Sequence, residues 1–159
     1  MMAYVIACML FLLGAGAGSG AGATESRVLP LARAIVDVVA ERGPLFKGED
    51  GERRTLALMV AVAYRESTFK ADAIGDHGRS VCAFQILHGA RSLLTDVRAC
   101  TDAGYTQLAA SVRACPGHPV APYARGTCES EDGRRISADR MRLARSLLGV
   151  VPRPQGATP

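Results

Sequence analysis

Apolar residues recur three or four positions apart in four separate segments of the chain, with polar residues between them. This spacing places the apolar side chains of each segment on one face of an α-helix. The four stripes are Val28, Leu31, Ile35, Val38 and Val39; Leu56, Met59, Val60 and Ala63; Val97, Cys100, Gly104, Leu108 and Val112; and Met141, Ala144, Leu147 and Leu148. The pattern therefore predicts a small helical domain.

Turn formers and capping residues predict where these helices begin and end. A Gly-Pro pair closes the first helix, and a proline breaks the third. Side chains that can accept hydrogen bonds from the first turn are expected to cap the second and fourth helices. In order, the helices are expected to end near Arg42, to run from Asp50 to Glu66, to run from Asp96 to Pro116, and to run from a Ser137 cap to a Gly149 stop.

Between the second and third predicted helices lies a segment rich in turn-forming residues, Gly75 to Ser80, followed by the short apolar run Val81 to Leu87. This order is typical of a hairpin-like loop that leads into a new element. Only 5% of the residues are aromatic and Trp is absent, so the core must be built from small aliphatic side chains. The sequence therefore predicts a mainly α fold with a short β-hairpin or irregular loop region.

The first 23 residues carry no charged side chain and are organised like a secretory signal peptide. An apolar block from Tyr4 to Leu13 is followed by a Gly/Ala stretch that ends in Ala21-Gly22-Ala23, an A-x-A cleavage site. We expect cleavage after Ala23, so that residues 1–23 are not part of the fold. No Lys or Arg precedes the apolar block, and an uncleaved membrane anchor is the alternative. Residues 24–151 would form the domain and residues 152–159 a disordered tail.

Four cysteines follow the expected cleavage site: Cys82, Cys100, Cys115 and Cys128. An even number outside the cytoplasm predicts two disulfides. Cys100 and Cys115 flank the third helix, which would separate them by about 22 Å, whereas bridged Cα atoms lie within about 7 Å. Two pairings stay open. We favour Cys82–Cys100 with Cys115–Cys128 because short loops close readily, and the alternative is Cys82–Cys115 with Cys100–Cys128.

The formal net charge of +4 does not point to a nucleic acid partner. Basic residues such as Arg53-Arg54 and Arg134-Arg135 are spread along the chain without interleaved aromatic residues. No cysteine pair has the spacing of a zinc site, and His77, His88 and His118 show neither ligand spacing nor a triad partner. We therefore expect no metal and no other cofactor.

Glu66 is the candidate catalytic residue, in the segment Tyr64 to Phe69, where an apolar helix gives way to a polar loop. A carboxylic acid against apolar surface keeps its proton more readily, so it can donate that proton near neutral pH. Glycosidic bond cleavage requires such a donor. A glutamate at a helix end is by itself better explained by a surface pair with Arg65 or Lys70, and only its context reverses that interpretation.

Four short motifs supply the context: Glu66-Ser67-x-Phe69; Asp72-Ala73-Ile74-Gly75-Asp76-x-Gly78-x-Ser80; Ala83-Phe84-Gln85-Ile86; and Ala121-x-Tyr123-x-x-Gly126. In type, order and spacing they resemble the soluble lytic transglycosylase and goose-type lysozyme superfamily. Asp96 and Gly104 further resemble the start and middle of the helix that follows in that family. The resemblance covers about half of the chain after the leader, from Leu56 to Gly126, and implies a lysozyme-like helical domain with the loop region near the active site.

The resemblance also implies roles for individual residues. Glu66 would be the single general acid and base, Ser67 and Gln85 would contact the substrate, and Tyr123 would line the cleft beside Glu66. The substrate would be peptidoglycan glycan strands, cleaved at the β-1,4 bond between MurNAc and GlcNAc with formation of a 1,6-anhydroMurNAc end. Together with the leader, this implies a secreted or periplasmic monomer of the bacterial cell envelope, with no stable membrane insertion after cleavage.

The chain departs from the family pattern at two places, and two other functions stay open. Cys82-Ala83 replaces Gly-Leu, and Ala124-Arg125 follows Tyr123 where Asn-Ala is expected; Arg125 could bind a peptide carboxylate or be a solvated loop residue. A hydrolytic lysozyme would use a second carboxylate, Asp72 or Asp76, although Asp76 is equally explained as a turn former. A catalytically inactive, lysozyme-like cell-wall-binding protein is the other alternative, and the presence of Glu66 argues against it.

Overall fold

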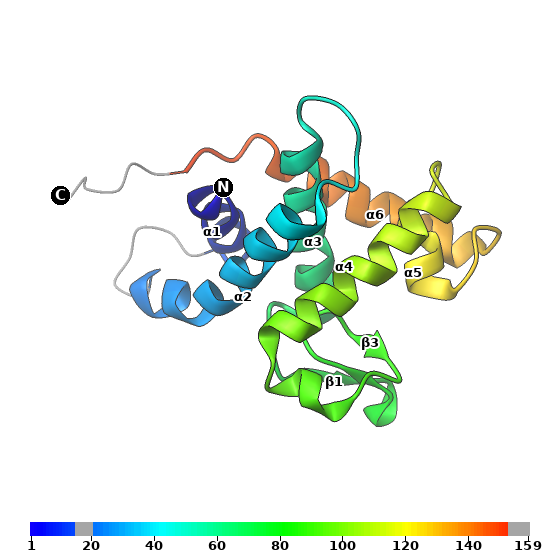
Figure 1. Ribbon diagram of the computed structural model, residues 1–159, viewed down its shortest axis with the longest axis horizontal. Helices are drawn as coiled ribbons and strands as arrows, with labels where there is room; N and C mark the ends of the chain where they lie inside the picture. The colour runs from blue at the N-terminus through cyan, green and yellow to red at the C-terminus, as the bar shows by residue number, and fades with distance from the viewer. Residues whose placement is uncertain (15–20, 153–159) are drawn as a thin grey trace.

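The computed structural model describes residues 1–14 and 21–152, and in these ranges the chain is mainly helical (Figure 1). The α-helices are α1 (Met2–Leu12), α2 (Ala21–Arg42), α3 (Gly51–Ser67), α4 (Val97–Ala114), α5 (Ala121–Arg125) and α6 (Glu131–Leu147). A small sheet follows α3 in the chain. The predicted fold class, mainly α with a short hairpin region, is confirmed. The expected tail lies outside the described residues from position 153 onward.

The hairpin region forms a three-stranded antiparallel sheet in the order β1-β2-β3, built from very short strands. Its strands are β1 (Ile74–Gly75), β2 (Ser80–Val81) and β3 (Ile86–Leu87), and the 3-10 helix η1 (Asp76–Gly78) connects the first two. Val81 pairs with Ile74 on one side and with Ile86 on the other. A further 3-10 helix, η2 (Arg91–Leu94), leads to α4. In Figure 1 the sheet lies at one end of the molecule.

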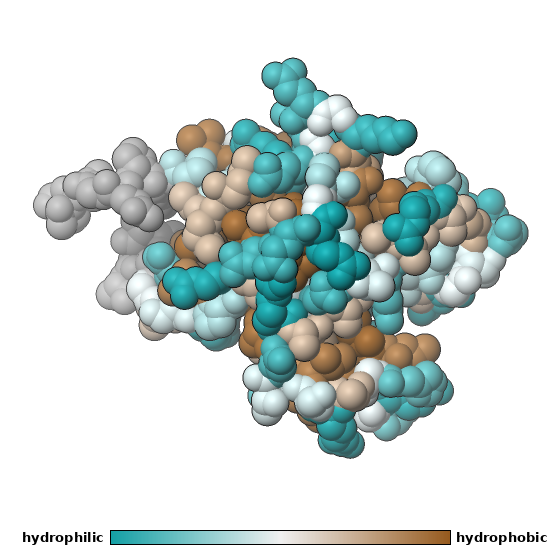
Figure 2. All heavy atoms as spheres, in the orientation of Figure 1, coloured by the Kyte–Doolittle hydropathy of each residue, from teal (hydrophilic) through white to brown (hydrophobic). Residues whose placement is uncertain are grey.

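Helix α3 forms the centre of the core. Its residues from Leu56 to Ala63 are all buried, because α1 and α2 pack against it and α6 lies along it. Helix α4 packs against α2, and the short α5 packs against α4 and α6. Hydrophilic side chains cover much of the face shown in Figure 2, while hydrophobic atoms gather at the end that holds the sheet in Figure 1.

Most of the predicted helix ends agree with the structure. Helix α2 ends at Arg42, and Asp96 caps α4 by accepting a hydrogen bond from the Ala99 amide at 2.9 Å. Asp50 occupies the N-cap position of α3 but makes no side-chain cap bond. The start of the last helix was predicted wrongly, because α6 begins at Glu131 rather than after Ser137.

The reason for this error is that Ser137 lies inside α6 and its side chain bonds a residue outside the helix instead of capping it. Its hydroxyl is buried and accepts from the Val120 amide at 3.0 Å. The N-cap is Ser130, which accepts from the Gly133 amide at 3.1 Å. Glu131 and Asp132 then place negative charge in the first turn, where the helix dipole favours it.

The N-terminal helix α1 packs into the core of the full-length chain, which differs from the expectation that residues 1–23 lie outside the fold. Tyr4, Val5, Cys8 and Met9 are buried, because this apolar segment packs against α2 and α3. The Tyr4 hydroxyl donates to the carbonyl of Leu147 at 3.3 Å. Removal of the leader stays a prediction. Within residues 1–14 and 21–152, no helix is long and apolar enough to cross a membrane.

Candidate active site

Glu66 lies in the last turn of α3, immediately before the chain changes direction towards the sheet. Thr68 ends the helix in the left-handed conformation, with φ of 55°, and its amide donates to the Tyr64 carbonyl at 2.8 Å. Phe69 follows with φ of 64° and is buried against the ring of Tyr64, at 5.4 Å between centroids. This reversal leaves the partly exposed Glu66 at the end of a helix whose middle, from Thr55 to Ala63, is buried.

The segment after Glu66 holds an unusual concentration of strained backbone. All non-glycine residues with positive φ in the described part of the chain lie between positions 68 and 88, and they are Thr68, Phe69, Asp76, His77, Cys82, Gln85 and His88. Left-handed conformations are unfavourable for residues with a Cβ, and such strain gathers at functional sites. The strain therefore marks the loops around the end of α3 as a candidate site.

Arg140 of α6 contacts Glu66 directly. Its Nη2 donates to Oε1 of Glu66 at 3.1 Å, across 74 positions of sequence. The exposed fractions are 21% for the Glu66 side chain and 15% for that of Arg140. Among the ion pairs of the described residues, this is the one in which both side chains are less than a quarter exposed.

Asp139 links this pair to the residue next to Glu66. Arg65 binds Asp139 with two nitrogens, each at 3.1 Å from a different carboxylate oxygen. The same carboxylate lies 3.5 Å from Nη1 of Arg140. Two consecutive residues of α3 are therefore joined to two consecutive residues of α6 by alternating charges.

Tyr123 of α5 lies near enough to Glu66 and Arg140 for both charges to affect its pKa. Its hydroxyl donates to the Phe84 carbonyl, and its backbone amide donates to Ser111 Oγ at 3.0 Å. Burial raises the pKa of Tyr123 well above its ordinary value, the Glu66 carboxylate raises it further, and the Arg140 guanidinium lowers it. The phenol is therefore a hydrogen-bond donor that joins α5 to the loop before β3.

Phe84 is held in place by α4. Its side chain is fully buried, and a Cβ at Gly104 would collide with its ring, so only glycine allows the helix to approach this closely. The disulfide between Cys82 and Cys100 ties the same loop to α4, with the two Cα atoms 6.2 Å apart. This confirms the favoured partner of Cys82.

The second predicted disulfide is not formed in the structure. Cys115 and Cys128 are free thiols, and Cys128 Sγ lies 3.5 Å from the carbonyl of Ala114. A hydrogen bond with the Cys115 thiol, together with smaller contributions from burial and nearby charge, raises the pKa of Cys128 to about 11. The two thiols are thus neighbours, and their pairing stays a prediction. Cys8 is a third free thiol, buried in α1.

The other residues assigned to substrate binding make hydrogen bonds within the protein. Ser67 Oγ donates to the carbonyl of Ala63 at 3.1 Å, one helical turn earlier. Gln85 Nε2 donates to the carbonyl of Cys82 at 3.0 Å, and its carboxamide packs so closely on Gly75 that a Cβ there would collide with it. In the described ranges neither side chain forms a hydrogen bond with Glu66, so each would have to exchange a protein partner for substrate.

The two candidates for a second carboxylate are exposed. Asp76 Oδ2 accepts from Ser80 Oγ at 2.7 Å within its own turn. Neither Asp72 nor Asp76 forms a hydrogen bond or ion pair with the Glu66 side chain in the part of the chain that the structure describes. Arg125 pairs with Asp132 at 2.9 Å and is exposed. The residue that does contact Glu66 is a cation.

Sequence reasoning missed Arg140, although its position in the helix carries a signal. The buried side of α6 includes Ser137, Ala144 and Leu147, and Arg140 falls on the same stripe. A cation on a buried stripe requires a partner, because an unpaired charge there is costly. The spacing could therefore have identified Arg140 as a residue that needs a partner. It could not have shown which carboxylate that partner is.

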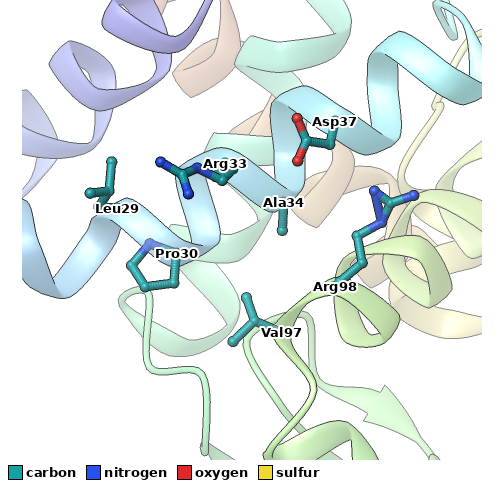
Figure 3. A pocket seen from close by; sticks show the side chains of 7 residues that line it. All are labelled: Leu29, Pro30, Arg33, Ala34, Asp37, Val97 and Arg98. Carbon is teal, nitrogen blue, oxygen red and sulfur yellow. The ribbon is translucent and has the colours of Figure 1, made fainter.

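A groove of about 450 Å³ between α2 and α4 is separate from the Glu66 region (Figure 3). Its lining residues are Leu29, Pro30, Arg33, Ala34, Asp37, Val97 and Arg98. Figure 3 shows Ala34 and Val97 facing each other across the groove, with charged side chains around it. None of the predicted site residues contributes to it. In the described ranges, no group of three or more His, Cys, Asp or Glu residues is placed to hold a metal ion.

Comparisons with known proteins give no match. No protein-family model matches the chain, and neither a curated protein nor a solved structure matches it. The resemblance of four short motifs to lytic transglycosylases and goose-type lysozymes therefore stays a prediction. The arrangement of Glu66, Tyr123 and Arg140 is the structural observation that bears on function.

Proposed function

We propose that this protein cleaves the β-1,4 glycosidic bond between MurNAc and GlcNAc in peptidoglycan, as a lytic transglycosylase with Glu66 as its one catalytic carboxylate. The observation that carries the proposal is the placement of Glu66. It lies at the end of a buried helix, next to strained loops and to the Tyr123 phenol, with no second carboxylate bonded to it in the described part of the chain. The four motifs supply the substrate class.

In the first step, protonated Glu66 donates its proton to the oxygen of the glycosidic bond. The bond between that oxygen and the anomeric carbon of MurNAc breaks, and the GlcNAc side leaves as an alcohol. General acid catalysis of this kind contributes about 10² to 10⁴ in rate. Glu66 is left as a carboxylate beside the Arg140 guanidinium, the state that the ion pair represents.

In the second step, the carboxylate takes the proton of the MurNAc C6 hydroxyl, whose oxygen bonds to the anomeric carbon of the same sugar. The product is a 1,6-anhydro ring, Glu66 regains its proton, and no water is consumed. Because the attacking group belongs to the substrate, the reaction is intramolecular and needs no second carboxylate to activate water.

The same proposal gives the neighbouring residues their roles. Tyr123 would line the cleft with its hydroxyl held by Phe84, while Ser67 and Gln85 would exchange their present partners for the sugar or its peptide. The Cys82–Cys100 disulfide favours an oxidising compartment. Together with the predicted leader, it supports a secreted or periplasmic location, where peptidoglycan is found.

The proposal is tested by incubating the purified protein with isolated peptidoglycan and measuring the soluble muropeptides released. We expect release at a rate that depends on protein concentration. Binding to peptidoglycan without any release would instead support the inactive cell-wall-binding alternative.

Substitution of Asp72 and Asp76 distinguishes a transglycosylase from a hydrolytic lysozyme. We expect Asp72→Asn and Asp76→Asn each to keep substantial activity, because neither carboxylate is joined to Glu66 by a hydrogen bond or ion pair among the described residues. An aspartate variant as inactive as Glu66→Gln, together with reducing sugar ends in the digest, would establish the hydrolase. Initial rates of muropeptide release from the same peptidoglycan preparation make this comparison.

A further inference from the structure

Arg140 occupies a position in α6 where a charged side chain is costly unless it has a defined partner. It shares the buried stripe of the helix with Ser137, Ala144 and Leu147, and its side chain is 15% exposed. Its Nε is buried without a hydrogen-bond partner among the described residues. An arginine in such surroundings is energetically unfavourable as a structural element. Its contact with Glu66 is therefore the feature that requires an explanation.

The contact engages one side of the Glu66 carboxylate. Arg140 Nη2 donates to Oε1 at 3.1 Å, while Oε2 makes no hydrogen bond to the described residues. A hydrogen bond to one oxygen restricts the orientation of the carboxylate, and the other oxygen stays available to give or take a proton. Such an arrangement suits a single residue that acts as general acid and then as general base.

The guanidinium is itself held in place from a second direction. Asp139 lies 3.5 Å from Nη1 of Arg140 and is bound by Arg65 through two nitrogens. Arg65 precedes Glu66 in α3, so the position of the guanidinium is coupled to the helix that carries the carboxylate. Arginine suits this task because its planar group binds two partners in a defined geometry.

We propose that Arg140 is the positioning residue of Glu66: it orients the carboxyl through Oε1 and stabilises the carboxylate that forms when Glu66 has donated its proton. This inference rests on the proposed function. The positive charge lies against the carboxyl group on which negative charge develops between the two steps, and such preorganised charge lowers the barrier. Arg140 acts through Glu66 and does not contact the sugar.

Arg140→Met tests the proposal because it keeps a long side chain and removes the guanidinium. We expect kcat for muropeptide release to fall about 100-fold, the cost of a misplaced catalytic group, with little change in KM. Arg140→Lys keeps the positive charge and should recover part of the loss. Arg42→Met removes an exposed arginine that pairs with Asp102 and should keep wild-type kcat and KM.

The melting temperature of each variant is measured in parallel. If Arg140→Met does not fold, kcat and KM of the folded Arg140→Lys and Arg140→Gln variants are compared with the wild type instead. A folded Met or Gln variant with wild-type kcat overturns the positioning role, and a rise in KM at unchanged kcat would make Arg140 a substrate contact instead.

A double variant separates this inference from the proposed function. In the Glu66→Gln background, Arg140→Met should cause little further loss, because Arg140 acts through the carboxyl that is already absent. A wild-type protein without activity, or an active Glu66→Gln variant, overturns the proposed function and the positioning role with it. An inactive Glu66→Gln variant beside a fully active Arg140→Met variant overturns the positioning role alone.

Discussion

Of the arginine–carboxylate pairs that join neighbouring helices, two differ clearly in their surroundings. Arg140 of α6 binds Glu66 of α3 at 3.1 Å, and Arg42 of α2 binds Asp102 of α4 at 2.8 Å. The shorter pair is the more exposed, with 43% and 41% of its side chains accessible, against 15% and 21% for Arg140 and Glu66. The distance between the charged atoms therefore does not report how strongly water screens each pair.

The difference in exposure determines how strongly water screens the attraction within each ion pair. An exposed pair is screened by water and salt and contributes about 0 to 1 kcal/mol. A partly buried pair is screened less, and removal of one partner leaves the other charge without compensation. Glu66 also lies beside the Tyr123 phenol and the strained loops, whereas Asp102 lies on the surface of a regular helix.

The largest expected difference between the two pairs is in catalysis. Glu66→Gln keeps the size of the side chain and its ability to accept a hydrogen bond from Arg140, but removes the transferable proton. We expect the rate of muropeptide release to fall by about two to four orders of magnitude. Initial rates on isolated peptidoglycan measure this, with circular dichroism to show that the fold is kept.

Asp102→Asn is the matched control, since it makes the same chemical change in the exposed pair. Its rate should equal that of the wild type. Equal rates for the two variants, whether both high or both low, would contradict the distinction between the pairs.

The next largest effect, a loss of stability, is expected when the disulfide on the Glu66 side of the molecule is removed. Cys82 and Cys100 are 18 positions apart and hold the loop whose Phe84 carbonyl accepts the Tyr123 hydroxyl. Replacing both by alanine should lower the free energy of unfolding by about 2 to 4 kcal/mol. Urea denaturation under non-reducing conditions measures it. With Cys115 and Cys128 as free thiols, as in the structure, changing both to serine should cost less, and a loss of the same size would show that they pair.

A smaller loss of stability is expected when Gly104, two positions from Asp102 on α4, is changed to alanine. Alanine is favoured over glycine in a helix by about 0.5 to 1 kcal/mol, but here its Cβ would collide with the buried Phe84 ring. Overpacking of this kind costs about 1 to 3 kcal/mol, so Gly104→Ala should be destabilising overall. Gln107→Ala changes an exposed position of the same helix and should not lower stability in the same denaturation experiment. A stabilised Gly104→Ala variant would show that Phe84 does not pack against α4 this closely.

The smallest effect is expected for the exposed pair itself. Arg42 also donates to Thr106 at 3.3 Å and lies over the Tyr105 ring at 5.3 Å, but it remains accessible to water. Arg42→Met should change the free energy of unfolding by about 1 kcal/mol or less. The difference from wild type should shrink further in high salt. A larger loss that is insensitive to salt would place this pair in the same class as Arg140 and Glu66.

The main helices could be predicted because the spacing of their apolar residues shows which face of each helix is buried. The four predicted stripes lie on α2, α3, α4 and α6, and the Asp96 cap was confirmed by its hydrogen bond to Ala99. Ser137 was taken for a cap because local sequence does not distinguish a hydroxyl that bonds its own helix from one that bonds a distant amide. The packing of α1 in the full-length chain has no signal of its own in the sequence, because an apolar leader and a buried helix have similar composition.

The candidate site could be predicted only in part. The Cys82–Cys100 bond could be predicted because it closes a short loop. Glu66 and Tyr123 were proposed from short motifs, and their roles stay predictions. Arg140 could not, because its partner lies 74 positions away and no local spacing connects them. The left-handed residues between 68 and 88 were also beyond prediction, since threonine and phenylalanine carry no sequence signal for that conformation.

The central claim is that Glu66 acts alone, with the substrate supplying the attacking group. The most direct test is mass spectrometry of the muropeptides that the wild-type protein releases from purified peptidoglycan. The account predicts 1,6-anhydroMurNAc ends, each one water lighter than a hydrolysed end, and none of them in a parallel digest with Glu66→Gln. Reducing MurNAc ends from the wild-type protein, or anhydro ends formed at an undiminished rate by Glu66→Gln, would contradict it.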